Sequence, residues 1–486
     1  MARGQNTAAN RTTPTPSSPV RRFGGVPAEV MGPRILFMLA ILALVLVGLV
    51  MVFSASTIEA IDEGSSPASF VMKQFAFAVV GALACVVCAF IPYRAWLGRL
   101  TDIAWVIAVA LIALTAAIGT EDLGAQRWVN IGPVSLQPSE FAKIAFILVA
   151  ARAFFMFREG GMDSRQFLVH IVVGLLLPLG ALFITQSDFG TTAICAVSII
   201  AVMWAGDVPV RAIGATLAVI GVAGFLGIVS SSYRLARMTS FLNPWGDGEG
   251  GLGTGYQLIH SFYAFAEGGL FGVGLGNSSE KFLYLPEAET DFIFAIIGEE
   301  LGMLGALAVV ALFLLLLFAG LRIARTAPDN FGAMLACGLV TMLVFQAFLN
   351  MACVMGVAPT TGKPLPFISS GGSSLIASFM MAGIVLSVSR ASGEPDVHDQ
   401  RRADLRVVRA DDGWGDFGRL EPSARGGSRR SRGVGAIDLG AASRGSGLRG
   451  GSVREPGGRG RSHGRDGASS RGGRRDGSSR PGRSRR

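Results

Sequence analysis

Cysteine is scarce in this sequence, and the positions of the cysteines exclude two common uses of the thiol. All five lie inside apolar runs: Cys85, Cys88, Cys195, Cys337 and Cys353. A thiol in such a run behaves as a small hydrophobic side chain, so neither a disulfide framework nor a zinc site is indicated. Cys85 and Cys88 form a C-x-x-C pair without flanking charge, so a redox role is not indicated either.

Signatures of several other protein classes are also missing. The glycine-rich segments do not stand between a strand and a helix, so dinucleotide binding is not indicated. No A-x-A cleavage site closes the first apolar run, which follows about thirty mostly polar residues, so we expect no cleavable signal peptide. No clear internal repeat is present, and the charges gather at one membrane edge, which disfavours an ion-coupled transporter.

Long apolar runs dominate what is present. Half of the 486 residues are hydrophobic, and the mean hydropathy is +0.49. The runs lie near 35–54, 71–92, 100–118, 138–157, 166–185, 189–206, 212–230, 291–320, 331–356 and 372–389. Each is long enough for a helix to cross a hydrocarbon core of about 30 Å. We therefore predict an all-α polytopic membrane protein with about ten transmembrane helices and a large extracytoplasmic loop between helices 7 and 8.

The distribution of arginine predicts the orientation. With a cytoplasmic N-terminus, the short inner loops contain Arg94, Arg99, Arg158, Arg165, Arg211, Arg322 and Arg325. Basic residues in short loops mark the cytoplasmic side, while the predicted outer loops are mainly acidic. We therefore place both termini in the cytoplasm.

Composition divides the chain into three parts. We predict a disordered cytoplasmic tail at 1–30 and a membrane domain at 31–390, with its large loop at 231–290. We predict a second disordered cytoplasmic tail, rich in Arg, Gly and Ser, at 391–486. The C-terminal tail holds 22 Arg against 12 Asp and Glu, a surplus of ten that accounts for the whole net charge of +9. Either the tail is only solvated or it binds an anionic leaflet or an acidic partner; we expect no nucleic acid.

Polar residues gather at four places on the predicted outer side. The segment 124–152 carries Glu140 and Lys143, three apart and therefore on one helical face, either as an internal salt bridge or as substrate contacts. The short connection 185–192 carries Asp188. The loop at 231–290 opens with Arg234 and Arg237, which suit an anionic substrate or lipid head groups. The segment 358–375, "APTTGKPLPFISSGGSSL", is too rich in Pro, Gly and Ser to be helical.

Lysine is as scarce as cysteine, and all four lysines fall on the predicted outer side: Lys73, Lys143, Lys281 and Lys363. Three of them lie within the polar clusters. A cationic lining of this kind suits a phosphate or pyrophosphate group.

Asp291 begins the eighth apolar run, at its outer edge. Steps of 100° per residue place Ala295, Gly298, Gly302 and Gly305 on its face, a pattern that serves either close helix packing or a groove for a lipid chain. Glu299 and Glu300 point elsewhere, and we expect both to be buried with polar partners. A carboxylate at an apolar boundary, facing a basic cavity, is suited to general-base catalysis.

Four segments together resemble the SEDS family of peptidoglycan glycosyltransferases, which includes FtsW, RodA and SpoVE. They are "GAQRWVNIGPVSLQPSEFAK", "QSDFGTT", "YQLIHSFYAFAEGGLFGVGLGNSSEKFLYLPEAETDFIFAIIGEELG" and "APTTGKPLPFISSGGSSL". The resemblance extends from about residue 35 to 390. It implies polymerisation of lipid II, the undecaprenyl-pyrophosphate-linked precursor, at the outer face of the bacterial plasma (inner) membrane. It also implies a class B penicillin-binding protein transpeptidase and other divisome membrane proteins as partners.

The resemblance implies that Asp291 of "TDFIF" is the catalytic general base, which takes a proton from the 4-hydroxyl of the acceptor sugar. Candidate substrate-binding residues are Arg127, Glu140, Lys143, Asp188, Arg234, Arg237, Lys281, Glu287, Lys363, Ser369 and Ser370. The sequence departs from the family pattern at Glu289, which adds a negative charge near the base, and at Ser187 and Phe189 of "QSDFG".

Alternative functions remain at this stage. The long tails and the "PEAETDFIFAIIGEELG" segment favour the septal type of polymerase, which acts in cell division, over the elongation type, which acts in cell shape. A lipid II flippase would share the topology and the cationic cavity without needing Asp291 for chemistry. We assign no cofactor and leave open a divalent ion, Mg²⁺ or Mn²⁺, that bridges pyrophosphate and a carboxylate.

Overall fold

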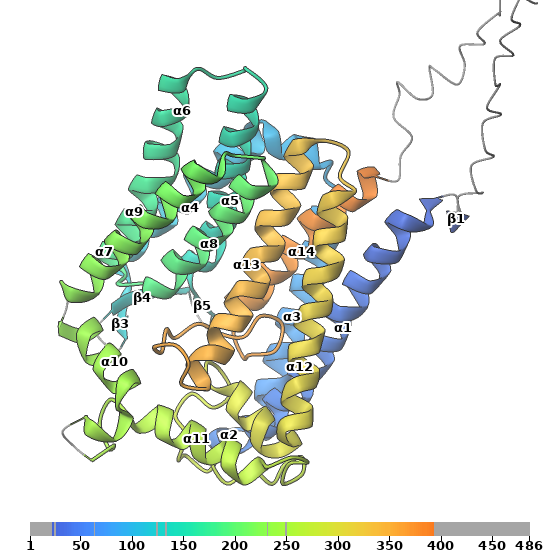
Figure 1. The fold of residues 1–486 in the computed structure, drawn as a ribbon. Helices are drawn as coiled ribbons and strands as arrows, with labels where there is room; N and C mark the ends of the chain where they lie inside the picture. Colours follow the sequence, from blue (N-terminus) through green and yellow to red (C-terminus); the bar gives the residue numbers. More distant parts are fainter. Residues whose placement is uncertain are drawn as a thin grey trace, which may run out of the picture. The chain divides into compact units, whose positions relative to one another are not determined.

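The computed structural model describes residues 22–23, 26–62, 64–122, 125–131, 134–230, 232–247 and 250–392. The segments predicted as disordered tails lie almost entirely outside this part. Within it, the long helices follow the predicted apolar runs (Figure 1). They are α1 (Ala28–Ala55), α3 (Pro67–Phe90), α4 (Arg99–Ile118), α5 (Pro138–Arg158), α8 (Phe189–Ala205), α9 (Val210–Val229), α12 (Ile293–Arg325), α13 (Asn330–Val354) and α14 (Gly372–Ser392).

One further apolar run is built from three helical pieces. α6 (Ser164–Ile171) passes through a π-helical turn, η2 (Val172–Leu176), into α7 (Leu177–Thr185). Pro178 lies just beyond the turn and has no N–H to offer to the carbonyl of Gly174. The indole Nε1 of Trp105 donates to that carbonyl at 2.9 Å instead. The proline therefore distorts the helix without leaving a backbone acceptor unpaired.

Among the residues that the structure describes, eight helical segments are long and apolar enough to span a membrane. Two others complete the predicted ten: α8, which is apolar but 17 residues long, and α5, which carries Glu140, Lys143, Arg152 and Arg158. Both pack against α13 in the interior of the bundle, where short length and charge are tolerated. The chain is thus an all-α, multi-pass membrane protein.

Shorter elements connect the spans. They are α2 (Thr57–Asp62), η1 (Tyr93–Leu97), α10 (Ser232–Leu242), η3 (Pro244–Gly246) and α11 (Tyr256–Gly268). The strands are the hairpin β1 (Arg22–Phe23) and β2 (Val26–Pro27), and the antiparallel meander β3 (Thr120–Asp122), β4 (Ala125–Ile131) and β5 (Val134–Leu136). α2 and α11 lie at one end of the helices, and the start of α6 lies at the other (Figure 1).

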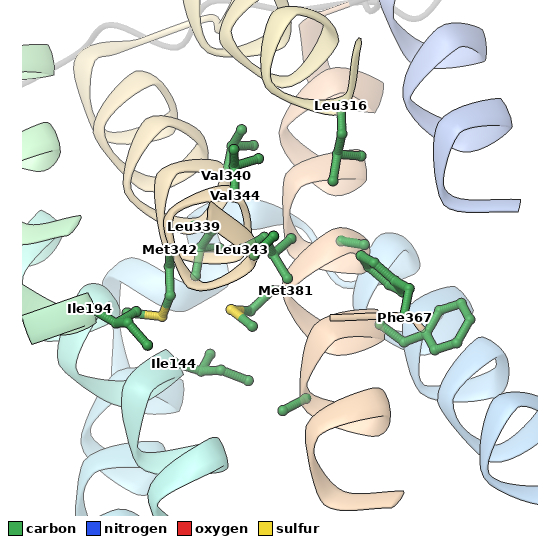
Figure 2. Close-up of a cluster of buried hydrophobic side chains, with 14 of the residues drawn as sticks. Ile144, Ile194, Leu316, Leu339, Val340, Met342, Leu343, Val344, Phe367 and Met381 are labelled. Carbon is green, nitrogen blue, oxygen red and sulfur yellow. The ribbon is translucent and has the colours of Figure 1, made fainter. Parts of the chain in front are cut away.

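The hydrophobic core is centred on α13. Leu339, Met342 and Leu343 of this helix are fully buried, and Figure 2 shows them among side chains from the neighbouring helices. Met342 faces Ile194 of α8, while Met381 of α14 lies on another side of the helix. α9 does not belong to this core. It is barely buried, and it exposes Val219, Val222 and Phe225. Such apolar exposure is expected where a helix faces lipid.

α12 is interrupted at Gly302, whose φ of +66° and ψ of −169° are not helical. A Cβ at this position would lie 2.3 Å from the amide nitrogen of Gly272, so only glycine fits. The freed backbone groups pair with the segment 269–274: Met303 N donates to Gly269 O at 2.9 Å, Val273 N to Glu299 O at 3.0 Å, and Gly274 N to Glu300 O at 3.1 Å. The segment 269–274 therefore packs against α12 at the break and forms the backbone hydrogen bonds that the helix lacks there.

The break at Gly302 contradicts the prediction of one continuous face of small residues from Asp291 to Gly305. The regular steps of 100° end at Gly302, so Gly305 does not extend the face. The packing alternative holds for Gly298, where a Cβ would come within 2.3 Å of the Phe265 ring on α11. Glycine at 298 therefore serves close contact between α11 and α12 rather than a groove for a lipid chain.

Candidate active site

The four predicted polar clusters meet at the end of the bundle that carries α2 and α11. α5 and α8 both begin there, and α12 begins just after Asp291. The segment 355–371 between α13 and α14 is non-helical and folds back among these helix starts (Figure 1). The prediction of a non-helical segment at 358–375 is therefore confirmed up to residue 371, whereas residues 372–375 already belong to α14. Two hydrogen bonds, from Ser369 Oγ to Thr290 O and from Ser370 N to Glu289 O, join this segment directly to the residues before α12.

The backbone around Asp291 is held by the segment 355–371 and by α13. Asn350 of α13 donates through Nδ2 to the carbonyl oxygens of Asp291 at 2.7 Å and Lys363 at 2.8 Å. Ser369 Oγ donates to Thr290 O at 2.6 Å, and Ser370 N donates to Glu289 O at 2.8 Å. Hydrogen bonds from α13 and from the segment 355–371 therefore hold the backbone of residues 289–291 in place.

The carboxyl group of Asp291 is half-buried, and its pKa is raised to about 6. Removal from solvent is the main cause, and the negative charge of Glu287 adds to it. Lys363, Arg237 and Arg127 oppose the shift, because each favours the charged form. Asp291 is thus a carboxylate near neutral pH with a raised proton affinity, which suits it to accept a proton from a hydroxyl group.

Two arginines face the region of Asp291 from other elements. Arg127 of β4 donates through Nε and Nη2 to the carbonyls of Gln186 at 3.1 Å and Ser187 at 3.0 Å. Arg237 of α10 donates to Thr360 O at 3.0 Å. Both line one cavity of about 50 Å³. A Cβ at Gly362 would lie 3.3 Å from Asp291 Oδ2 and 3.7 Å from Arg127 Nη1, so glycine keeps the space between them open.

A buried charge network lies beneath this cavity. Lys363 Nζ contacts Asp188 Oδ2 at 2.7 Å and Glu140 Oε1 at 3.9 Å, and Lys143 Nζ contacts Glu140 Oε2 at 2.9 Å. Gln346 of α13 accepts from Lys143 and donates to Pro364 O at 3.0 Å. The four charged side chains are at most 1% exposed. Charges buried to this degree persist only when paired, so the network locks α5, α8 and the segment 355–371 together.

Asp188 caps the start of α8, accepting from Thr191 N at 2.9 Å. Burial acts against its charge, but Lys363 and Arg127 outweigh burial and lower the pKa of Asp188 to about 2. Asp188 is therefore a permanent anion at physiological pH. It fixes Lys363, whose carbonyl is in turn held by the Asn350 that holds Asp291.

A second set of buried charges lies along α12. Lys281 pairs with Glu300 at 3.1 Å and reaches Ser54 on α1. Glu299 accepts from Ser278 Oγ at 2.6 Å and from Ser279 N at 2.5 Å. The prediction that Glu299 and Glu300 are buried with polar partners is confirmed. Lys281, predicted as a substrate contact, is only 4% exposed and has its charge matched by Glu300.

The remaining predicted residues have the following places. Glu287 is exposed, has φ of +58°, and accepts from Thr290 Oγ1 at 2.5 Å. Ser369 and Ser370 brace the backbone before Asp291. The side chain of Arg234 lies outside the described residues. Glu289, the departure noted in the sequence, is 8% exposed, and its pKa is raised to about 8 by burial and by a hydrogen bond with Glu59.

Three amide side chains of the site were not predicted from the sequence: Asn350, Gln346 and Gln74. The amide of Gln74 donates to Ser369 O at 3.0 Å. All three lie inside predicted membrane spans. Polar side chains in such spans are expensive and therefore candidates for function, which is the signal that identifies them. Within the described part of the chain, no three His, Cys, Asp or Glu side chains converge as metal ligands.

Comparisons with known proteins match the chain over most of this fold. The model of the cell cycle protein family FtsW/RodA/SpoVE matches residues 34–394. The stage V sporulation protein E of Bacillus subtilis is 39% identical over 365 residues, which cover 74% of this chain and 98% of that protein. A protein of Trichlorobacter lovleyi named "Probable peptidoglycan glycosyltransferase FtsW" is 39% identical over 358 residues, covering 73% and 92%.

Solved structures agree with the fold. An aspartate-to-alanine mutant of the rod shape determining protein RodA from Thermus thermophilus is 26% identical, with a TM-score of 0.53, covering 74% of this chain and 98% of that one. A chain from a structure titled "Structural coordination of polymerization and crosslinking by a peptidoglycan synthase complex" has a TM-score of 0.57 at 24% identity, with the same coverage.

Proposed function

The chain belongs to the FtsW/RodA/SpoVE family of cell cycle proteins, and on that premise we propose that it is a peptidoglycan glycosyltransferase that polymerises lipid II at the outer membrane face. The observation that carries this proposal is the environment of Asp291. One carboxylate with a raised pKa stands on a braced backbone, and Arg127 and Arg237 line a cavity beside it. The transfer needs a base that accepts the proton of the attacking hydroxyl group and cations that stabilise the leaving pyrophosphate.

The chemistry follows from these two features. The oxygen of the acceptor sugar's 4-hydroxyl attacks the anomeric carbon of the lipid-linked chain, and its proton passes to the Asp291 carboxylate. The bond between that carbon and the pyrophosphate oxygen breaks with inversion, and the electron pair leaves on undecaprenyl pyrophosphate. Arg127 and Arg237 stabilise the negative charge that develops there.

Arg127 and Arg237 line a cavity of about 50 Å³ beside Asp291, which suits a phosphate group of the substrate. We infer that the sugars lie on the outer side of Asp291, while a phosphate reaches between the arginines. Among the other predicted substrate contacts, Glu287 is exposed and available to the sugars, and Arg234 is a further candidate for the pyrophosphate.

The buried residues have a positioning role in this proposal. Lys143, Lys363, Glu140 and Asp188 are inaccessible to substrate, and they fix the segment 355–371 that braces Asp291. Ser369 and Ser370 brace the same backbone directly. Lys281 and Glu300 hold the loop before Asp291 to α12 and α1.

We further propose the cellular setting. Arginine in the short loops at the end opposite Asp291 favours a cytoplasmic location for that end and for both termini. Relatives named FtsW favour septal synthesis during division over elongation. A class B penicillin-binding protein would cross-link the strands made here, and the fold likeness to a chain of a peptidoglycan synthase complex is compatible with such a partner.

The test is polymerisation of labelled lipid II by the purified full chain with its penicillin-binding partner. We expect glycan strands from the wild type and a loss of at least about 100-fold in Asp291→Asn, the usual range for a general base. Glu267→Gln, which changes an exposed carboxylate on α11, is the matched control and should retain activity. Undiminished synthesis by Asp291→Asn refutes the role of Asp291. Lipid II flipping without polymerisation by the wild type would favour the flippase.

A further inference from the structure

A large cavity lies far from Asp291, near the other end of the bundle. It has a volume of about 760 Å³ and is bounded by the end of α5, by α6 to α7, by α8 and by α9. This is within the range of pockets that hold whole ligands. Arg158, on its wall, is fifteen residues beyond Lys143 of the buried network on α5, which corresponds to about 22 Å along the helix. The cavity therefore belongs to the opposite half of the membrane.

The walls of the cavity are polar at one end only. Most of the lining is aliphatic or aromatic, with Phe154, Leu175 and Ile220 as examples. The charged residues of the lining are Arg158 and Asp207, where α5 and α8 end. A cavity with a charged mouth at the membrane surface and an apolar interior matches an amphiphile that enters head-outward from the adjacent leaflet.

The sides of the cavity are apolar where they meet the exterior. Leu176 at the end of η2 is 57% exposed, and Val219 on α9 is 69% exposed. Both line the cavity. Since these helices have the length and hydropathy of membrane spans, the surroundings at this depth are lipid chains. An acyl chain can therefore pass between α7 and α9 without crossing a polar barrier.

Arg158 has donors to spare for a head group. Its Nη1 donates to Gly206 O at 2.7 Å and contacts Asp207 Oδ2 at 2.9 Å. Both contacts use this single nitrogen, and the side chain is 39% exposed. The Nε and Nη2 donors point away from these partners in the planar guanidinium, a geometry that binds phosphate oxygens in a bidentate manner.

We propose that this cavity is a binding site for a phospholipid of the leaflet opposite Asp291, with its acyl chain inside and its phosphate on Arg158. The site is separate from the lipid II site of the proposed function and does not depend on it. Asp207, at φ of +49°, holds Arg158 at the mouth from the turn between α8 and α9.

The test uses the full chain in vesicles of phosphatidylethanolamine and phosphatidylglycerol, with a phosphatidylglycerol probe that carries a photoreactive acyl chain. We expect cross-links to concentrate on cavity residues of α7, α8 and α9. Ala215→Trp, which places an indole into the cavity from α9, should lower this labelling at least fivefold. Val222→Trp on the same helix, outside the lining and 61% exposed, should leave it unchanged.

The head-group contact has its own test. A photoreactive diacylglycerol, which lacks the phosphate, should label the wild-type cavity at least threefold less than the phosphatidylglycerol probe does. Arg158→Gln should remove this difference, while its unfolding temperature stays equal to that of the wild type and shows that the variant is folded.

Three results would overturn the proposal. One is labelling spread evenly over the exposed helices and insensitive to Ala215→Trp. Another is cross-linking of the cavity to a second protein chain in place of the lipid. The third is displacement of the probe by a polyprenyl phosphate but not by unlabelled phosphatidylglycerol.

Discussion

The side-chain amide of Asn350 donates to the carbonyl oxygen of Asp291 at 2.7 Å, and through the same nitrogen to that of Lys363 at 2.8 Å. One buried amide on α13 thus joins the two segments that form the candidate site. Lys363 in turn reaches Asp188 at the start of α8. The position of Asp291 therefore depends on α13, on α8 and on the segment 355–371 together.

Asn350→Ala removes both bonds. Each is worth about 1 kcal/mol, and two buried carbonyls lose their donor, so we expect a loss of about 2–3 kcal/mol in stability. Because Asp291 is no longer held in place, kcat for lipid II polymerisation should fall more than KM rises. Thermal unfolding and steady-state kinetics measure the two effects. Asn277→Ala, which removes an exposed amide that donates to Val273 O, is the control; equal effects in both variants would contradict the bracing role.

The rate should depend on pH through Asp291. With its pKa raised to about 6, the carboxylate fraction grows as pH rises through 6, so polymerisation should increase along the same curve. Glu287→Gln removes a negative charge that raises this pKa, so the curve should move to lower pH. A pH–rate profile of the wild type and of Glu287→Gln measures the shift. A curve that moves to higher pH would exclude the assigned influence of Glu287.

The raised pKa of Asp291 also affects stability. We expect the folded state to lose stability as pH rises, whereas the rate of polymerisation increases. A carboxyl whose pKa is higher in the folded state stabilises that state while it is protonated, below its ordinary value near 4. This contribution is lost as pH rises from about 4 through 6. Asp291→Asn keeps a neutral side chain, so its unfolding temperature should fall less than that of the wild type over this interval. Parallel curves for the two proteins would show that Asp291 does not titrate there.

Lys363→Met leaves Asp188 and Glu140 without one of their counter-charges. Removing one partner of a buried pair costs about 3–5 kcal/mol, because the other charge stays buried and unmatched. Adding Asp188→Asn should recover part of this loss, and a double-mutant cycle of unfolding free energies measures the coupling. Lys73→Met removes an exposed lysine and should change stability little. Additive effects of Lys363→Met and Asp188→Asn would mean that the two residues do not interact.

Gly302→Ala tests the break in α12. A Cβ there meets Gly272 N at 2.3 Å, and the positive φ disfavours alanine, so we expect a loss above about 2 kcal/mol and weaker holding of the loop 269–274. Gly214→Ala, in regular helix with open space around its Cα, should be neutral or slightly stabilising. Hydrogen exchange at Val273 and Gly274 reports the loop directly. Unchanged protection in Gly302→Ala would show that the break does not anchor it.

The sequence by itself determined the membrane spans and the place of Asp291. Apolar runs of spanning length leave the backbone no alternative to helix in a membrane. The observed helices follow the predicted runs, with the largest difference at α1, which begins at Ala28 where the run begins near 35. Proline, glycine and serine at 358–375 likewise predicted the non-helical segment between α13 and α14. These features depend on local composition, which a single sequence records directly.

Tertiary structure alone decided which polar residues pair and which stay accessible. Glu140 and Lys143 are neighbours by helical spacing, but their union with Lys363 and Asp188 joins residues that are far apart in the chain. The break at Gly302 exists because the loop 269–274 supplies hydrogen bonds that the helix gives up. Such choices depend on which segments meet in space. Lys143 and Lys363, which predicted a cationic lining, are therefore buried in ion pairs with Glu140 and Asp188.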